Sequence, residues 1–170
     1  MATVWLLRHA KAEKDGRGGP TDFSRALTGR GRNQATALGK YLGKEPKKLR
    51  DTPRPELVLC STARRTQETL AAVLGASGLR PKVEMMDAIY EATEDDLKYL
   101  LTGYPGVTSL MVVGHQPTLG LLREDLLQSA ERSERPTGVC ALAVVSFPAD
   151  VISEIVPGTG RLVHMADKLA

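Results

Sequence analysis

The sequence predicts an α/β domain with three layers, in which helices cover both faces of a mostly parallel central sheet with mixed edge strands. Short apolar runs of strand length alternate with longer segments whose apolar residues recur at helical spacing. Continuous apolar runs are typical of strands buried on both faces, as in parallel sheets. The 170 residues contain no internal repeat and no low-complexity tract, so we expect a single domain over residues 1–170.

Several apolar runs have the length and composition of strands. They are residues 3–7, 56–60, 83–86, 109–113 and 139–147, and, as edge strands, residues 151–156 and 161–165. The polar stretch at residues 11–24 is rich in glycine. We predict that it is a long functional loop rather than a linker.

Between these runs lie segments with helical spacing of apolar residues. They are residues 29–42, 63–74, 94–102 and 117–128. Thr28 is the expected N-cap of the first helix, and Ser61 or Thr62 is the expected N-cap of the second. Thr93 opens the third helix with a capping-box pattern, and Pro117 suits the first turn of the fourth.

The composition excludes several classes of function. The net charge of +3 is too small to indicate a nucleic-acid partner, and four Tyr, two Phe and one Trp are too few for base-stacking platforms. Cys60 and Cys140 lack disulfide or zinc spacing, which favours a reducing compartment. The first apolar run is too short for a signal peptide or a membrane span, so we expect a cytoplasmic protein with no membrane partner.

Polar side chains follow directly after three of the predicted strands. They are Arg8 with His9, the segment Ser61-Thr62-Ala63-Arg64, and Gly114 with His115. Because the carboxyl ends of parallel strands meet at one edge of a sheet, we expect these clusters to converge.

The converging residue types indicate phosphate chemistry. Arg8 and Arg64, beside a helix N-terminus, are the expected receptors for phosphate oxygens. Their positive charge should lower the pKa of His9 and His115, and a neutral imidazole is the form that acts as a nucleophile. The histidines, including His164, lack metal-ligand spacing, so we expect no metal and no other cofactor.

Other hydrolase patterns are missing from the sequence. A cysteine-dependent phosphatase needs an arginine six positions after its cysteine, but the residue at that distance from Cys60 is Thr66. A serine hydrolase needs Gly-x-Ser-x-Gly, which the sequence around Ser77 does not provide. No P-loop or dinucleotide fingerprint occurs either. The histidine and arginine clusters therefore form the candidate site.

At these clusters the sequence resembles the histidine phosphatase superfamily, and within it the small SixA-type phosphohistidine phosphatases. The matching segments are Leu7-Arg8-His9-Ala10, Arg25-Ala26-Leu27-Thr28 with Gly31, Ser61-Thr62-Ala63-Arg64 with Thr66 and Thr69, and Val113-Gly114-His115-Gln116-Pro117. The resemblance covers roughly residues 3–125 and implies a phosphoglycerate-mutase-like fold. Ala10 stands where glycine is usual, and Thr62-Ala63 stands where Ser-Pro is common.

The resemblance also implies a role for each matching residue. His9 would be the nucleophile that forms a phosphohistidine intermediate, and His115 would stabilise the transferring group. Arg8 and Arg64 would hold the phosphoryl oxygens. The family uses no metal, because arginines and imidazoles supply the charge stabilisation that Mg²⁺ gives elsewhere.

The general acid is open at this point. Larger relatives that act on phosphate esters carry a glutamate on an insertion, and residues 74–112 leave no room for one. Glu91 is the first candidate and Asp22 the second, and an absent acid is the third possibility. Asp22 and Arg25 are also expected to contact substrate. A phosphohistidine leaves as imidazole and needs less help from an acid than an alkoxide does, which favours a phosphohistidine protein domain as substrate.

Two alternatives stay open beside this hypothesis. One is a small-molecule phosphomonoesterase or mutase of the same superfamily, and the other is a phospho-ligand binding module without turnover. The presence of both histidines disfavours the binding module, since binding alone needs no nucleophile. The sequence leaves open whether a signalling phosphohistidine or a metabolite is the natural target, and it leaves the oligomeric state open.

Overall fold

The computed structural model describes residues 1–14, 21–133 and 135–169, so residues 15–20 of the predicted glycine-rich loop lie outside the described residues. The strands are β1 (Thr3–Arg8), β2 (Leu57–Ser61), β3 (Lys82–Met86), β4 (Ser109–Gly114), β5 (Leu142–Ser146) and β6 (Arg161–Ala166). The helices are α1 (Gly29–Gly43), α2 (Arg64–Ser77), α3 (Asp87–Tyr90), α4 (Glu94–Leu101) and α5 (Thr118–Leu126). Within the described residues, no helix has the length and apolarity needed to cross a bilayer.

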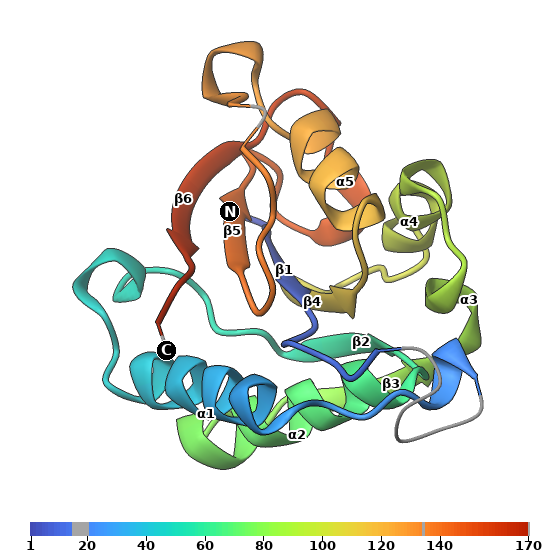
Figure 1. The fold of residues 1–170 in the computed structure, drawn as a ribbon. Helices are drawn as coiled ribbons and strands as arrows, with labels where there is room; N and C mark the ends of the chain where they lie inside the picture. The colour runs from blue at the N-terminus through green and yellow to red at the C-terminus, as the bar shows by residue number, and fades with distance from the viewer. Residues whose placement is uncertain (15–20, 134, 170) are drawn as a thin grey trace.

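The strands form one sheet in the order β3-β2-β4-β1-β5-β6, with helices on both faces (Figure 1). The pairs β3–β2, β2–β4 and β4–β1 are parallel, whereas β5 and β6 are joined to the sheet by antiparallel pairing. Helices α1 and α2 pack side by side on one face, and α4 and α5 lie on the other. The predicted three-layer α/β/α class, mostly parallel with mixed edge strands, is confirmed.

Each face of the sheet has its own apolar core, because successive side chains of a strand point to opposite faces. In β1, Val4 and Leu6 join the core beneath α4 and α5. Trp5 and Leu7 join the core beneath α1 and α2. Burial on both faces explains why the central strands are apolar throughout.

The strand register brings the predicted polar clusters to one edge. Arg8 lies opposite Gly114 in the parallel pairing of β1 with β4, so the chain leaves both strands at the same level. β2 is paired with β4 up to Cys60. His9 and His115, each the next residue after its strand, therefore lie together at the carboxyl edge of the sheet.

Two of the predicted helix caps are confirmed. The Thr28 hydroxyl accepts a hydrogen bond from the Gly31 N–H at 2.9 Å and caps α1. Thr93 and Asp96 form a capping box at the start of α4. In both helices the cap satisfies an N–H group that has no partner within the helix itself.

Helix α2 begins differently from the prediction. Its N-cap residue is Ala63, which has no side-chain acceptor, rather than Ser61 or Thr62. Ser61 is the last residue of β2, and the Thr62 hydroxyl is hydrogen-bonded to the carboxylate of Asp87 at 2.6 Å. The predicted cap residues are therefore engaged elsewhere, and the helix starts one residue later than expected.

The predicted edge strand at residues 151–156 is wrong. These residues contain a 3-10 turn, η4 (Ile152–Glu154), in which Ile152 is fully buried, while Val156 is 60% exposed. Their apolar side chains thus do not share one face, as a half-buried strand would require. The strand predicted at residues 139–147 is shorter than expected, because Cys140 has a left-handed backbone with φ 55° that starts a turn before β5.

Candidate active site

The two histidines predicted at strand ends face each other at the carboxyl edge of the sheet. The His9 N–H donates to the carbonyl oxygen of Gly114 at 3.2 Å, which ties the end of β1 to the end of β4. The ring centroids of His9 and His115 are 5.5 Å apart. The two imidazoles therefore lie side by side, close enough for one small ligand to contact both.

The hydrogen bonds of His9 define which ring nitrogen is free. Its Nδ1 lies 2.7 Å from the carbonyl oxygen of Ala10. A carbonyl oxygen only accepts, so Nδ1 carries the proton and Nε2 keeps its lone pair. The Ala10 N–H donates to the Thr69 hydroxyl at 2.9 Å, which fixes the backbone that orients the ring. Nε2 is therefore the ring nitrogen of His9 whose lone pair is free to meet a ligand.

His115 also keeps one ring nitrogen free of partners among the described residues. Its Nε2 is 2.8 Å from the hydroxyl oxygen of the buried Ser61. Its Nδ1 is buried and has no hydrogen-bond partner among the described residues. When the Ser61 hydroxyl donates to Nε2, Nδ1 carries the proton and can donate to a ligand oxygen.

Both histidines are neutral at physiological pH. Burial is the largest cause that lowers the pKa of His9 to about 4, and the charges of Arg65 and Arg8 lower it further. Burial also lowers the pKa of His115 to about 3, followed by the charge of Arg65. The sequence argument predicted this direction from the arginine charges, but desolvation contributes more.

Two arginines place buried donors beside the histidines. The Arg8 Nη1 donates to the Thr137 carbonyl oxygen at 2.8 Å, and both Nη atoms of Arg65 donate to Asp22, at 2.9 and 3.2 Å. In the described part of the chain, the Nε atoms of Arg8 and Arg65 are buried without a partner. Buried N–H donors need an acceptor, and an anion with several oxygens can serve these donors together.

The structure does not bring Arg64 to this site, so its predicted role in holding phosphate is wrong. The Arg64 side chain is 54% exposed, and its Nε donates to Glu68 on the same helix at 2.9 Å. Arg65, with a side chain only 7% exposed, faces the histidines instead. The signal that could have identified Arg65 is helical spacing, because it lies four residues before Thr69 and eight before Val73 on the buried face.

Asp22 is part of the site but cannot serve as the general acid at neutral pH. Its carboxylate accepts hydrogen bonds from the Tyr90 hydroxyl at 2.5 Å, from Arg25 and from Arg65. The Tyr90 hydrogen bond is the main cause that lowers the Asp22 pKa to about 2, and the two arginines add to it. An ionised carboxylate bound by two cations has no proton to give, and its hydrogen bond with Arg65 holds that guanidinium in place.

Arg25 and Glu91, the other two predicted site residues, differ in their contacts with the residues around His9. Arg25 donates to Asp22 and to the Glu13 carbonyl oxygen, and its charge lowers the pKa of His9, so it lies within the electrostatic reach of the site. Glu91 is exposed just after α3. Its neighbour Tyr90 makes the ring contact with His115, at 5.6 Å between centroids. The role proposed for Glu91 stays a prediction.

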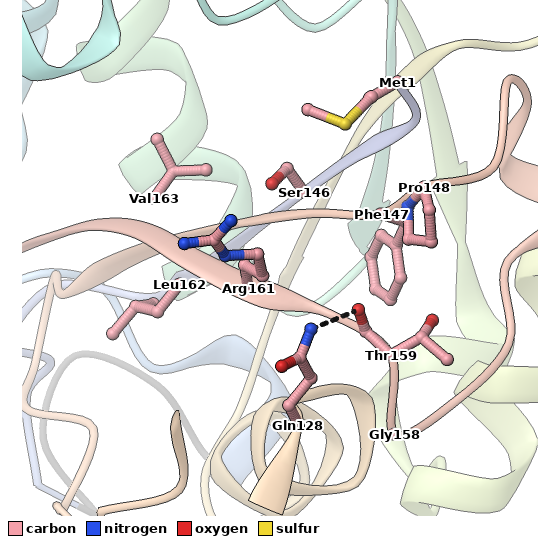
Figure 2. A pocket seen from close by; sticks show the side chains of 10 residues that line it. All are labelled: Met1, Gln128, Ser146, Phe147, Pro148, Gly158, Thr159, Arg161, Leu162 and Val163. Carbon is pink, nitrogen blue, oxygen red and sulfur yellow. Dashed lines mark hydrogen bonds between the residues drawn. The ribbon is translucent and has the colours of Figure 1, made fainter. Parts of the chain in front are cut away.

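A hollow of about 610 Å³ lies at the opposite edge of the sheet, near the start of β1, and Figure 2 shows the side chains that line it. It is lined by Met1, Ser146 and the start of β6, where Arg161 is the charged side chain among the described residues. Its described lining contains no histidine, unlike the edge where His9 and His115 meet. In the described residues, no group of three or more His, Cys, Asp or Glu side chains could hold a metal ion.

Phosphoryl transfer needs a nucleophile with a free lone pair and fixed donors for the phosphoryl oxygens. His9 Nε2 and the donors of Arg8, Arg65 and His115 match both requirements in kind, so the arrangement suits phosphoryl-transfer chemistry. The chain belongs to the histidine phosphatase superfamily, branch 1, whose sequence profile matches residues 4–97. That segment includes His9 and both arginines.

Similar proteins extend the comparison to the whole chain. A protein of Mycobacterium tuberculosis strain H37Rv, described as uncharacterized, is 33% identical over 168 residues, covering 92% of this chain and 96% of the relative. Two solved structures, from Nakamurella multipartitia and Agrobacterium tumefaciens, are provisionally assigned as phosphohistidine phosphatase SixA. Each is 27% identical, with TM-scores of 0.79 and 0.78, over 99% and 98% of this chain and 97% of each neighbour. The chain is therefore a SixA-like member of the superfamily.

Proposed function

We propose that the protein removes phosphoryl groups from phosphohistidine in another protein, through a covalent phosphohistidine intermediate on His9. The observation that carries the proposal is the set of buried donors without partners. Among the described residues these atoms are Arg8 Nε, Arg65 Nε and His115 Nδ1. Each belongs to a residue that contacts the His9 ring or lowers its pKa. Three donors beside one nucleophilic nitrogen fit a phosphoryl group.

The reaction would proceed in two displacements at phosphorus. In the first, the lone pair of His9 Nε2 attacks phosphorus while the bond from phosphorus to the substrate imidazole breaks, and that imidazole takes a proton from water, which leaves a hydroxide ion that the phosphate released in the second step neutralises. In the second, water attacks the phosphoryl group on His9, which releases phosphate and restores the neutral imidazole. The donors of Arg8, Arg65 and His115 hold the phosphoryl oxygens throughout both steps.

The state of Asp22 favours phosphohistidine over phosphate esters. Asp22 is the carboxylate whose charge acts on His115, and a pKa of about 2 keeps it ionised at neutral pH. An ester must leave as an alkoxide unless an acid protonates it, whereas an imidazole leaves with less assistance. A site whose nearby carboxylate is ionised therefore suits a phosphorus–nitrogen bond.

A substrate panel tests the proposal. A phosphohistidine peptide, a phosphoserine peptide and a sugar phosphate are compared at equal concentration in the presence of a chelator. We expect kcat/KM for the phosphohistidine peptide to exceed the others by at least about a hundredfold, the usual contribution of general acid catalysis. Faster turnover of an ester would favour the phosphomonoesterase or mutase alternative. A rate that returns only with added divalent metal would contradict a metal-free mechanism.

A further inference from the structure

A basic groove lies beside the active site at the same edge of the sheet. It has a volume of about 590 Å³ and is formed by the start of α1, the loop before β5 and the chain after β6. The charged side chains that line it are Arg30, Arg135, Asp167 and Lys168. The reaction on His9 uses none of these side chains, so the groove is open to another role.

Strand register places the groove close to His9. Leu7 lies opposite Leu142 of β5, and Leu142 lies opposite Ala166 of β6, so the residues after β6 reach the level of the active site two strands away. Neighbouring strands are about 4.8 Å apart, which puts the groove roughly 10 Å to one side of the site. The Cys140 N–H donates to the His9 carbonyl oxygen at 3.0 Å, which joins the loop before β5 to the nucleophile.

The part of α1 that lines the groove is also hydrogen-bonded to the chain just after His9. Gln34, which lines the groove, accepts a hydrogen bond from the Lys11 N–H at 3.0 Å. Lys11 lies two residues after His9. A polypeptide bound with its phosphoryl group at His9 can therefore run directly into the groove, since about three to five extended residues span the distance.

The charge of the groove is positive. Arg135 is ion-paired with Asp167, while Arg30 and Lys168 are exposed and have no ion-pair partner within the described residues. Two unpaired cations beside a phosphate site attract further negative charge. No aromatic side chain is among the described residues that line the groove, which disfavours stacking with nucleic-acid bases.

We propose that this groove binds acidic residues of the protein that carries the phosphohistidine. The inference rests on the proposed function and adds the chemistry of the partner. Carboxylates three to five residues from the phosphohistidine would pair with Arg30 and Lys168. Because exposed pairs are weak singly, the two of them together should favour an acidic substrate by at most about tenfold, and salt should remove the preference.

The test compares two synthetic phosphohistidine peptides, one with Asp and Glu on either side of the phosphohistidine and one with Ser and Gly. The double variant Arg30→Glu, Lys168→Glu is set against the matched control Arg80→Glu, Arg161→Glu. Arg80 and Arg161 are exposed at the starts of β3 and β6, at the opposite edge. Phosphoramidate, which is too small to reach the groove, measures the chemistry alone.

We expect the unmodified protein and the control to prefer the acidic peptide by up to about tenfold in kcat/KM, and the groove variant to lose this preference. All three should hydrolyse phosphoramidate equally. If phosphoramidate is hydrolysed but the acidic peptide is not preferred, or if the groove variant keeps the preference, the docking inference is overturned. If neither phosphoramidate nor either peptide is hydrolysed, the proposed function fails, and the docking inference fails with it.

Discussion

Arg65 connects three elements at the active site. It projects from α2, donates to both the carbonyl and the carboxylate of Asp22, and lies 5.8 Å from the centroid of the Tyr90 ring. Its charge is among the causes that lower the pKa of His9 and His115. These contacts fix the guanidinium in one orientation, with its Nε left to donate to a phosphoryl oxygen.

Replacing Arg65 should therefore damage catalysis, while replacing its neighbour should not. We expect Arg65→Ala to lower kcat about 10²- to 10³-fold, the usual effect of removing one fixed donor to a developing negative charge. Arg64→Ala removes only an exposed pair with Glu68 and should stay within about twofold. Steady-state kinetics on a phosphohistidine peptide measure both variants. Equal losses, or a larger loss for Arg64→Ala, would contradict the assignment of Arg65.

The protonation of His9 gives a second prediction at this scale. Burial and nearby cations lower its pKa from 6.5 to about 4, so Nε2 should keep its lone pair down to about pH 5. Between pH 6.5 and about pH 4, the unfolded chain binds more protons at His9 than the folded protein does. The free energy of unfolding should therefore fall as the pH is lowered through this window.

NMR titration of the histidine ring protons checks this directly. The His9 and His115 signals should not titrate between pH 8 and pH 5, a range chosen to span the ordinary histidine pKa of about 6.5. His9→Ala and His115→Ala assign the signals. A midpoint near the ordinary value for His9 would show that the ring is solvated and that the described burial is wrong.

Helices α1 and α2 make their closest approach at Gly39. A Cβ atom there would lie 2.6 Å from the Val73 carbonyl oxygen and 2.7 Å from the Ala76 Cβ. Both partners belong to α2, the helix that carries Arg65. The absence of a side chain at Gly39 thus sets the distance between the two helices.

Gly39→Ala should lower the free energy of unfolding by about 1–3 kcal/mol, because the added methyl group forces the helices apart. Gly75→Ala is the matched control, since a Cβ at Gly75 meets nothing within 4 Å and alanine favours a helix more than glycine does. Urea unfolding measures both variants. A Gly39→Ala protein as stable as the parent would mean that the helices are not packed this closely.

The strands and helices differ in how well the sequence pattern predicts the position of their side chains. Strand ends follow from apolar runs, so the convergence of His9 and His115 could be predicted from strand order alone. The orientation of Arg64 and Arg65 depends on helix register, in which one residue rotates a side chain by about 100°. The contact of Asp22 with Tyr90 joins residues far apart in the chain that share no pattern. It could only be found in the structure.

At the scale of the whole molecule, the active site and the basic groove share the carboxyl edge of one sheet. The parallel strands β1, β2 and β4 end beside the candidate catalytic side chains, and the residues that flank β5 and β6 form the neighbouring groove. The other edge carries the hollow shown in Figure 2, whose described lining contains no histidine. One edge of the sheet thus combines the candidate phosphoryl site with the groove that we propose binds an acidic protein.

Trapping the phosphoenzyme tests the central claim most directly. The protein is mixed with a radiolabelled phosphohistidine peptide, quenched in alkali during turnover and mapped by mass spectrometry. We predict acid-labile, alkali-stable phosphate on His9, and no label and no turnover in His9→Ala. Full turnover by His9→Ala, or a label on another residue, would contradict the account.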